Sequence, residues 1–359
     1  MKPVYLCGRG LASALGLDLV QSLATLRKGG VPAASCFLPG IMGGHFPYHA
    51  IPYQLNNPYQ LNNWNERARE LVLSVADEAG IKPACTGALF IASTSFDIGA
   101  GEAGATQRNY SAFSNKIVAW LQWSGPVYTI NTACTSSLNA LLAAHALLGS
   151  GELEEAVVLG FELDNMLTLG GFAAMQLLST SSSKPFGTHR DGLVLGEAVS
   201  CLRLSTQEVS NWKILGGANV VDGSQPTGAS IAAVSSMVQR ALAASGLNAD
   251  EIDLIKVQAA GSPANDAIEA KGLLNIFKHL PSLVSFKAAI GHTMGASGAA
   301  EIALLTACLE QGAWPSYEHS VDATLGVELI AQMPAAVRHV MATILGFGGS
   351  HATVVLEQA

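Results

Sequence analysis

Charged residues are scarce in this sequence. Aspartate, glutamate, lysine and arginine make up 13% of the 359 residues, whereas apolar residues make up 49%. Such a chain buries a large core and exposes little charge, so we expect another subunit to cover part of its surface. The formal net charge is −8, and lysine and arginine form no cluster. This balance argues against nucleic acid as a partner.

Long apolar runs and a secretory leader are also lacking. The most apolar stretches, residues 138–148 and 299–309, contain polar residues, and both are shorter than the roughly 20 residues that a membrane span needs. The N-terminus has no basic region followed by an apolar run and a cleavage site. We therefore expect a cytoplasmic protein without a membrane span.

The cysteines lack the short spacings that zinc sites use. In a long apolar chain they are typical of reduced cytosolic thiols, and a free cysteine is most often an inert core residue. The sequence thus predicts no disulfide framework, no metal and no cofactor, and a catalytic thiol must be argued from its surroundings. The six cysteines are Cys7, Cys36, Cys85, Cys134, Cys201 and Cys308.

Apolar strands alternate with helices along the chain, which predicts an α/β fold with buried strands. In the first half we expect helices at 65–80 and from 132 to about 150, and strands at 88–94, 127–131 and 155–161. In the second half we expect helices at 236–246, 264–277 and 296–312, and strands at 252–258 and 283–291.

Glycines that end corresponding helices suggest that the two halves are copies of one unit. Gly80 and Gly246 are 166 residues apart, and Gly151 and Gly312 are 161 apart. Similar offsets are typical of an internal duplication. The alternative is a chance echo of the kind that any α/β protein shows. Residues 40–64 break the pattern with PYQLNN written twice, which predicts a surface loop whose aromatic residues favour an interface.

Cys134 lies where the strand at 127–131 gives way to a helix, in the segment NTACTSSLNA (131–140). The unpaired N–H groups and dipole of a helix N-terminus favour a thiolate, which is the nucleophilic form of cysteine. Small neighbours permit a tight turn and a close approach by substrate. The pattern indicates a nucleophile elbow.

His292 is the second candidate for chemistry. It lies between glycines in a turn after a predicted strand, five residues after Lys287 and nine before Glu301. A lone histidine is most often a satisfied structural residue, but these neighbours favour a catalytic role. A glycine-rich loop at 184–198 and a glycine-rich turn between two strands at 345–357 accompany it.

Five segments, in this order and over nearly the whole chain, resemble the motifs of the β-ketoacyl synthases, which are condensing enzymes with a thiolase-like fold. The segments are TACTSS (132–137), KPFGTHRDGLVLGEA (184–198), AGSPANDAIEA (260–270), KAAIGHTMGASGAAE (287–301) and GFGGSHA (346–352).

The resemblance implies a fold of two duplicated halves stacked in five α/β/α/β/α layers. The N-terminal half, residues 1–215, would carry Cys134, and the C-terminal half, residues 216–359, would carry Gln258 and His292. It also implies a dimer, which would account for the low surface charge.

The resemblance implies roles for the matching residues. Cys134 would hold an acyl chain, as a thioester, delivered by an acyl carrier protein. His292 would stabilise the enolate that forms when a malonyl group loses carbon dioxide, and Lys287 and Glu301 would support it. The backbone N–H groups of Cys134 and Phe347 would form the oxyanion hole, and Phe347 would gate the acyl channel.

The sequence departs from the family at two positions. Where the family carries the histidine of a His-Gly-Thr-Gly-Thr motif, this chain has Gln258, although Asn265 and Asp266 match. A carboxamide donates hydrogen bonds but does not titrate near pH 7. His351 stands at a usual asparagine position; we expect it, like His145, His189 and Arg190, to be structural.

Two interpretations follow. The first is a partner subunit of the chain-length-factor kind, which pairs with an active homologous synthase in type II polyketide or aryl-polyene assembly. The second is a self-sufficient synthase, acting as a homodimer through a Cys-Gln-His site. A thiolase is disfavoured because GFGGSHA lacks a second reactive cysteine, and a decarboxylase or acyltransferase on the same fold is a lesser alternative.

Overall fold

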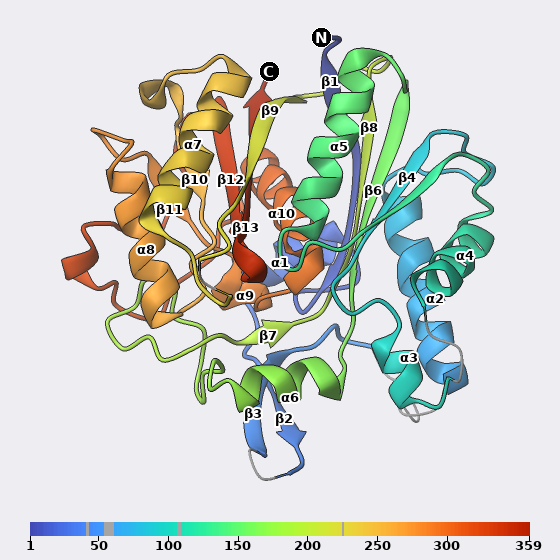
Figure 1. The fold of residues 1–359 in the computed structure, drawn as a ribbon, viewed down its shortest axis with the longest axis horizontal. Coiled ribbons are helices and arrows are strands. Elements are labelled where there is room, and N and C mark those ends of the chain that lie inside the picture. The colour runs from blue at the N-terminus through green and yellow to red at the C-terminus, as the bar shows by residue number, and fades with distance from the viewer. Residues whose placement is uncertain (41–42, 54–60, 106–108, 225) are drawn as a thin grey trace.

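The computed structural model describes residues 1–40, 43–53, 61–105, 109–224 and 226–359, which form a layered α/β molecule (Figure 1). Its main sheet has ten strands in the order β11-β10-β12-β13-β9-β1-β8-β6-β4-β5. The strands are β1 (Val4–Ser13), β4 (Ala88–Ala92), β5 (Val127–Ile130), β6 (Glu155–Glu162), β8 (Ala198–Ser205), β9 (Trp212–Val221), β10 (Leu254–Lys256), β11 (Ser282–Val284), β12 (His339–Leu345) and β13 (Ser350–Gln358).

The ten strands fall into two sets of five with the same topology. The N-terminal set runs β5-β4-β6-β8-β1 and the C-terminal set runs β11-β10-β12-β13-β9. In each set the first three strands are parallel, and the last two are each antiparallel to the strand before. Strands β1 and β9 join the sets through two residue pairs only. This repeated topology confirms the predicted duplication.

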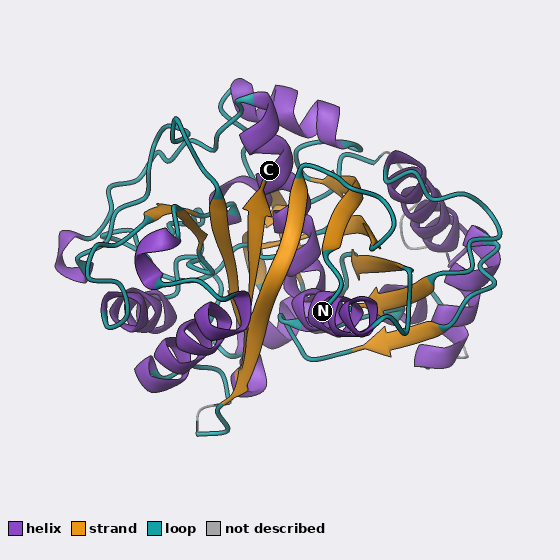
Figure 2. Ribbon diagram, turned by 90° about the horizontal axis from the view of Figure 1, so that it is seen from above, coloured by secondary structure: helices purple, strands orange, loops and turns teal. Residues whose placement is uncertain are grey.

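Helices form three layers around the two sets of strands (Figure 2). Helices α5 (Ser136–Ser150) and α10 (Ser297–Gln311) lie between the sets, since α5 contacts β4 and β6 on one side and β9 and β13 on the other, and α10 contacts β8 and β12. Helices α2 (Leu61–Glu78) and α4 (Tyr110–Leu121) cover the outer face of the N-terminal set. Helices α7 (Ile231–Ser245) and α8 (Pro263–Leu274) cover the outer face of the C-terminal set. The five predicted layers are therefore present.

Burial on both faces explains why the strands are so apolar. In β4, Phe90 faces the cluster around α5 and α10, whereas Leu89 and Ile91 face the cluster under α2 and α4. Successive side chains of a strand point to opposite faces, so a strand between two helix layers needs apolar residues at every position.

A small second unit lies below the main sheet in Figure 1. Strands β2 (Ala34–Leu38), β3 (Gly44–His49) and β7 (Leu195–Gly196) form a three-stranded sheet, next to helix α6 (Met166–Ala174). The remaining helices are α1 (Leu19–Arg27), α3 (Ile98–Glu102) and α9 (Lys287–Ile290).

The four glycines used to infer the duplication occupy equivalent positions. Gly80, Gly151, Gly246 and Gly312 all follow the last turn of a helix with φ between 68° and 86°. Glycine adopts this left-handed conformation without a Cβ clash, which is why it ends helices.

Two local predictions were wrong. The segment 283–291 is not one strand, because Phe286 takes helical dihedral angles and residues 287–290 form α9. This turn carries the Lys287 side chain into the interior beside Glu301. The stretch 40–64 is not all loop, since it contains β3 and the start of α2.

Most of the PYQLNN repeat, residues 54–60, lies outside the described residues. The expected division after residue 215 falls within β9.

Candidate active site

Cys134 lies in the turn between β5 and α5, as predicted. The residue before it, Ala133, has φ +52°, an uncommon conformation for a residue with a side chain. The turn is fixed by hydrogen bonds from the Ser136 hydroxyl to the Ala133 carbonyl (2.6 Å) and from the Thr132 amide to the Ser136 hydroxyl (2.9 Å). Only 4% of Cys134 is exposed.

The structure brings His292 directly against this thiol. Its Nε2 atom lies 3.1 Å from the Cys134 sulfur, although the two residues are 158 positions apart in the chain. The histidine backbone is bonded to the strand around β7 on both sides: its amide donates to Val194 (2.7 Å), and the Gly196 amide donates to its carbonyl (3.1 Å).

Lys287 fixes the orientation and tautomer of His292. Its ammonium group contacts His292 Nδ1 (3.1 Å), Ser297 Oγ (3.1 Å) and the Glu301 carboxylate. A lysine ammonium has three hydrogens and no lone pair, so its contact makes Nδ1 the acceptor and leaves the ring hydrogen on Nε2, facing Cys134. The pKa of His292 is held well below its ordinary value, first by burial and then by the charges of Lys287 and Lys256.

The predicted acidity of Cys134 was wrong. Burial raises the pKa of this thiol from 9.0 to about 11, and the smaller lowering effects of the Phe347 amide and the Lys287 charge do not offset it. A helix N-terminus stabilises a thiolate only against the cost of removing the anion from water. At neutral pH the Cys134 side chain is therefore a protonated thiol.

Two backbone amides act on the thiol group. The N–H groups of Phe347 and of Cys134 itself both favour its ionised form and so lower its pKa in part. Donors in this arrangement also suit the oxygen of a thioester carried by the sulfur, which becomes negative during attack. The Phe347 ring stacks on Phe172 of α6, with ring centroids 5.4 Å apart and planes 16° apart.

Gln258 lines the same small cavity as Cys134, His292 and Phe347. The cavity has a volume of about 20 Å³, and 8% of Gln258 is exposed. The Gln258 amide N–H donates to Glu269 (2.7 Å), whereas its buried side-chain oxygen Oε1 has no hydrogen-bond partner among the described residues. All five predicted side chains thus belong to one cluster, with Lys287 and Glu301 behind the histidine.

Two buried charged residues near the site escaped the sequence analysis. Glu162 accepts hydrogen bonds from the amides of Thr94, Ser95 and Gly295, and so ties the end of β4 to the segment after His292. Lys256 forms an ion pair with Glu301 (2.8 Å). The available signal was a charged residue in the middle of the apolar strand IDLIKVQ.

The remaining candidates lie elsewhere. His351 is fully buried, is not among the cavity-lining residues, and has no hydrogen-bond partner for its ring among the described residues. His145 is buried within α5. Arg190 forms an ion pair with Asp322 (2.9 Å) and bonds the Gly187 carbonyl within the 184–198 loop.

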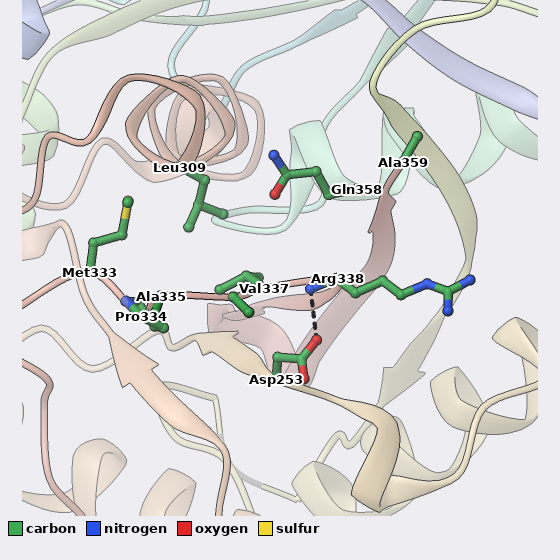
Figure 3. Close-up of a pocket in the computed structure, with 10 residues that line it drawn as sticks. Asp253, Leu309, Met333, Pro334, Ala335, Val337, Arg338, Gln358 and Ala359 are labelled. Carbon is green, nitrogen blue, oxygen red and sulfur yellow. Dashed lines mark hydrogen bonds between the residues drawn. The ribbon is translucent and has the colours of Figure 1, made fainter.

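A larger cavity of about 400 Å³ lies near the C-terminus, lined by residues 333–338 before β12, by Leu309 of α10 and by the end of β13 (Figure 3). Two of the residues that line it are joined by a hydrogen bond from the Arg338 amide to the Asp253 carboxylate (2.8 Å). None of the predicted site residues lines it. Across the described ranges, no cluster of histidine, cysteine or acidic residues could hold a metal ion, and no helix is long and apolar enough to cross a membrane.

Family models match this chain over most of its length. The model for the N-terminal domain of β-ketoacyl synthases matches residues 88–210, and that for the C-terminal domain matches residues 208–320. The chain belongs to the β-ketoacyl synthase family. Cys134 falls in the N-terminal match, and Gln258 and His292 fall in the C-terminal match.

Curated relatives are about 30% identical to this β-ketoacyl synthase chain over the aligned residues. The chloroplastic 3-oxoacyl-[acyl-carrier-protein] synthase II of Arabidopsis thaliana is 29% identical over 66% of the chain and 48% of its own length. Erythronolide synthase EryA2 of Saccharopolyspora erythraea is 31% identical over 69% of the chain and 8% of its own length. The chain thus spans half or less of these two relatives.

Solved structures share the fold over the whole chain. A chain of the ketosynthase (ApeO) complex with its chain length factor (ApeC) from Xenorhabdus doucetiae has a TM-score of 0.82, with 23% identity over 100% of this chain and 98% of its own. A chain of the ishigamide ketosynthase/chain length factor has a TM-score of 0.85, with 21% identity over 100% and 99%. These likenesses establish the thiolase-like architecture.

Proposed function

We propose that this chain is a partner subunit of the chain-length-factor kind, which forms a heterodimer with an active β-ketoacyl synthase and has weakened condensing activity of its own. Gln258 is the observation that carries the proposal. It occupies the cavity beside Cys134 and His292, at a position where the family has a histidine.

The missing histidine weakens the chemistry in a specific way. Decarboxylation of a malonyl group places negative charge on a thioester oxygen, and a titratable ring can meet that charge as a cation, whereas a carboxamide offers only a neutral N–H. If the cation contributes about 3 kcal/mol at the transition state, its loss lowers the rate roughly a hundredfold.

An exposed sheet edge supports the pairing. Strand β5 is the outermost strand of the N-terminal set, and Tyr128 on it is 41% exposed. A row of unpaired backbone groups at a sheet edge is a template for pairing with another chain. Because β5 leads directly into Cys134, a partner at this edge would lie next to the catalytic turn. Two of the similar structures are ketosynthase complexes with a chain length factor.

The substrates would be acyl and malonyl groups delivered by an acyl carrier protein, as in the similar complex of a type II polyketide ketosynthase with its carrier protein. An aryl-polyene or related polyketide assembly is the setting we propose. All six cysteines are free thiols, which fits the cytoplasm.

A self-sufficient synthase is the second candidate. The arrangement of Cys134, His292, Lys287 and Glu301 favours it, since sulfur and imidazole are already 3.1 Å apart. In this case the acyl group would pass to Cys134 as a thioester. The enolate of decarboxylated malonyl thioester would then attack its carbonyl and release the thiol.

The test combines native mass with turnover. The chain is expressed alone and together with a β-ketoacyl synthase from the same genome, and each product is incubated with acyl and malonyl carrier protein. We expect a one-to-one heterodimer that forms ketoacyl product, and a lone chain that forms almost none. Gln258→His should raise the turnover of the lone chain. An active homodimer with wild-type Gln258 would overturn the proposal in favour of the second candidate.

A further inference from the structure

Lys256, the last residue of β10, is a fully buried lysine whose exposed fraction is 0%. Its ammonium group donates to the Thr343 carbonyl (2.6 Å) and pairs with Glu301 Oε2 (2.8 Å). A buried ammonium is costly unless it is paired and hydrogen-bonded. The side chain therefore lies in a site built for it, two residues before Gln258.

The carboxylate that pairs with Lys256 is already occupied. Glu301 meets Lys287 through Oε1 and Lys256 through Oε2, and all three side chains are fully buried. Two lysine side chains thus share one carboxylate. Burial lowers the pKa of Lys256, and its pairing with Glu301 opposes that lowering; with both amines protonated, the three side chains carry one excess positive charge. An excess charge in a low-dielectric region acts over several ångströms on neighbouring groups.

The groups that face Lys256 come from three helices and the following turn. Glu301 lies on α10, Lys287 on α9 and Glu269 on α8, while His292 follows α9. Burial is the main cause that raises the pKa of Glu269 to about 7, which reduces the negative charge that this carboxyl sets against Lys256 near neutral pH.

We propose that Lys256 is a positioning residue of this site, which holds Glu301 in place and supplies a fixed positive charge that keeps His292 neutral. The neutral ring, with its Nδ1 atom against Lys287, presents Nε2–H to Cys134 and to any thioester bound there. The same charge stabilises negative charge that develops in the cavity, where Gln258 contributes none. Lys256 acts through Glu301 and Lys287 and does not touch the reacting atoms.

The inference rests on the same Cys134–His292 site as the proposed function, but its test needs neither carrier protein nor partner subunit. Titration of His292 is followed by NMR of histidine-labelled protein below pH 7, with His292→Asn used to assign the signal. In the wild-type chain we expect the ring to stay neutral throughout the range in which the protein is folded. Failure of the heterodimer experiment would not alter this result.

Two variants remove the charge. Lys256→Met removes the ammonium group, and Lys256→Gln keeps N–H donors for Thr343 and Glu301 but carries no charge, so it stays informative if the methionine variant does not fold. Both should bring protonation of His292 into the pH range in which the protein is folded, because the positive charge that opposes the imidazolium is gone.

The matched controls separate charge from packing. Lys256→Met combined with Glu301→Gln restores the excess charge through Lys287 alone and should bring the midpoint back down. Lys271→Met removes the same charge from an exposed position on α8 and should leave the midpoint unchanged. A ring that stays neutral in Lys256→Gln as it does in the wild type, or a double variant that titrates like the single one, would overturn the proposal.

Discussion

At the scale of single residues, burial decides the state of the nucleophile. The position of Cys134 before a helix predicts a thiolate, but this helix end lies in the interior between the two sets of strands. The cost of moving an anion out of water exceeds the benefit of the amides and of Lys287, so the pKa of the thiol is about 11. The Nε2–H of His292, 3.1 Å away, can donate to the sulfur but cannot take its proton, so this ring does not ionise the thiol.

The first prediction concerns the reactivity of this thiol. At pH 8, alkylation of Cys134 by iodoacetamide should be about a hundredfold slower than that of the unfolded chain, because a pKa near 11 instead of 9 lowers the thiolate fraction by that factor. The rate should still rise about tenfold per pH unit between pH 8 and pH 9. Mass spectrometry of the peptide that contains Cys134 measures both.

Cys134→Ser gives the background from the other cysteines. A rate that reaches a plateau near pH 7 would mean that the helix N-terminus, and not burial, controls the thiol.

At the scale of elements, the site depends on how closely α5 and α10 approach. Gly298 lies in the first turn of α10, and a Cβ there would lie 2.6 Å from the Leu138 side chain and 2.9 Å from its amide nitrogen. The two helix starts are also tied by a hydrogen bond from the Ala299 amide to Ser137 Oγ (3.0 Å). The first turn of α5 follows Cys134, and α10 carries Glu301, so this contact sets the distance between the two halves of the site.

The second prediction tests this contact. Gly298→Ala should lower the free energy of unfolding by about 1–3 kcal/mol, since the added methyl meets backbone that cannot move freely. It should also reduce the protection of Cys134 from alkylation. Urea denaturation and the alkylation rate are the measurements.

Gly171→Ala is the matched control, because Gly171 lies in α6 and a Cβ there meets no atom within 4 Å. This variant should gain about 0.5–1 kcal/mol from the better helix propensity of alanine. Equal stability of Gly298→Ala and the wild type would contradict the close approach.

At the scale of the whole molecule, the open edge at β5 is where an assembly would form. The C-terminal set ends at β11, which has the equivalent position, but only β5 leads into the catalytic turn. A partner there would cover Tyr128 and neighbouring exposed residues of a chain with few charges.

The third prediction places a charge on this edge. Tyr128→Lys should abolish copurification with the partner synthase, because an edge lysine opposes strand pairing and would be buried in the interface. Size-exclusion chromatography of the coexpressed proteins measures the loss. Val209→Lys, at a loop position that is 76% exposed, should leave the complex intact, and a complex that survives Tyr128→Lys would rule out β5 as the interface.

The sequence by itself determined the family and the alternation of strands and helices, and it suggested the duplication that the strand order confirms. It did so because motif residues such as Cys134 and His292, and helix-ending glycines such as Gly80 and Gly246, report local requirements of the backbone. The sequence also predicted that Gln258 lies at the site, because Gln258 stands where the family motif has its histidine.

Only the tertiary structure decided the protonation states of the site residues. Whether Cys134 is ionised, whether His292 is neutral and what Lys256 does all depend on burial and on partners that come from distant parts of the chain. Glu301 is 45 residues from Lys256, and only the fold brings Lys256 of β10 against Glu301 of α10. Electrostatic energies depend on the distance between groups and on the exclusion of water, and the order of residues in the chain specifies neither directly.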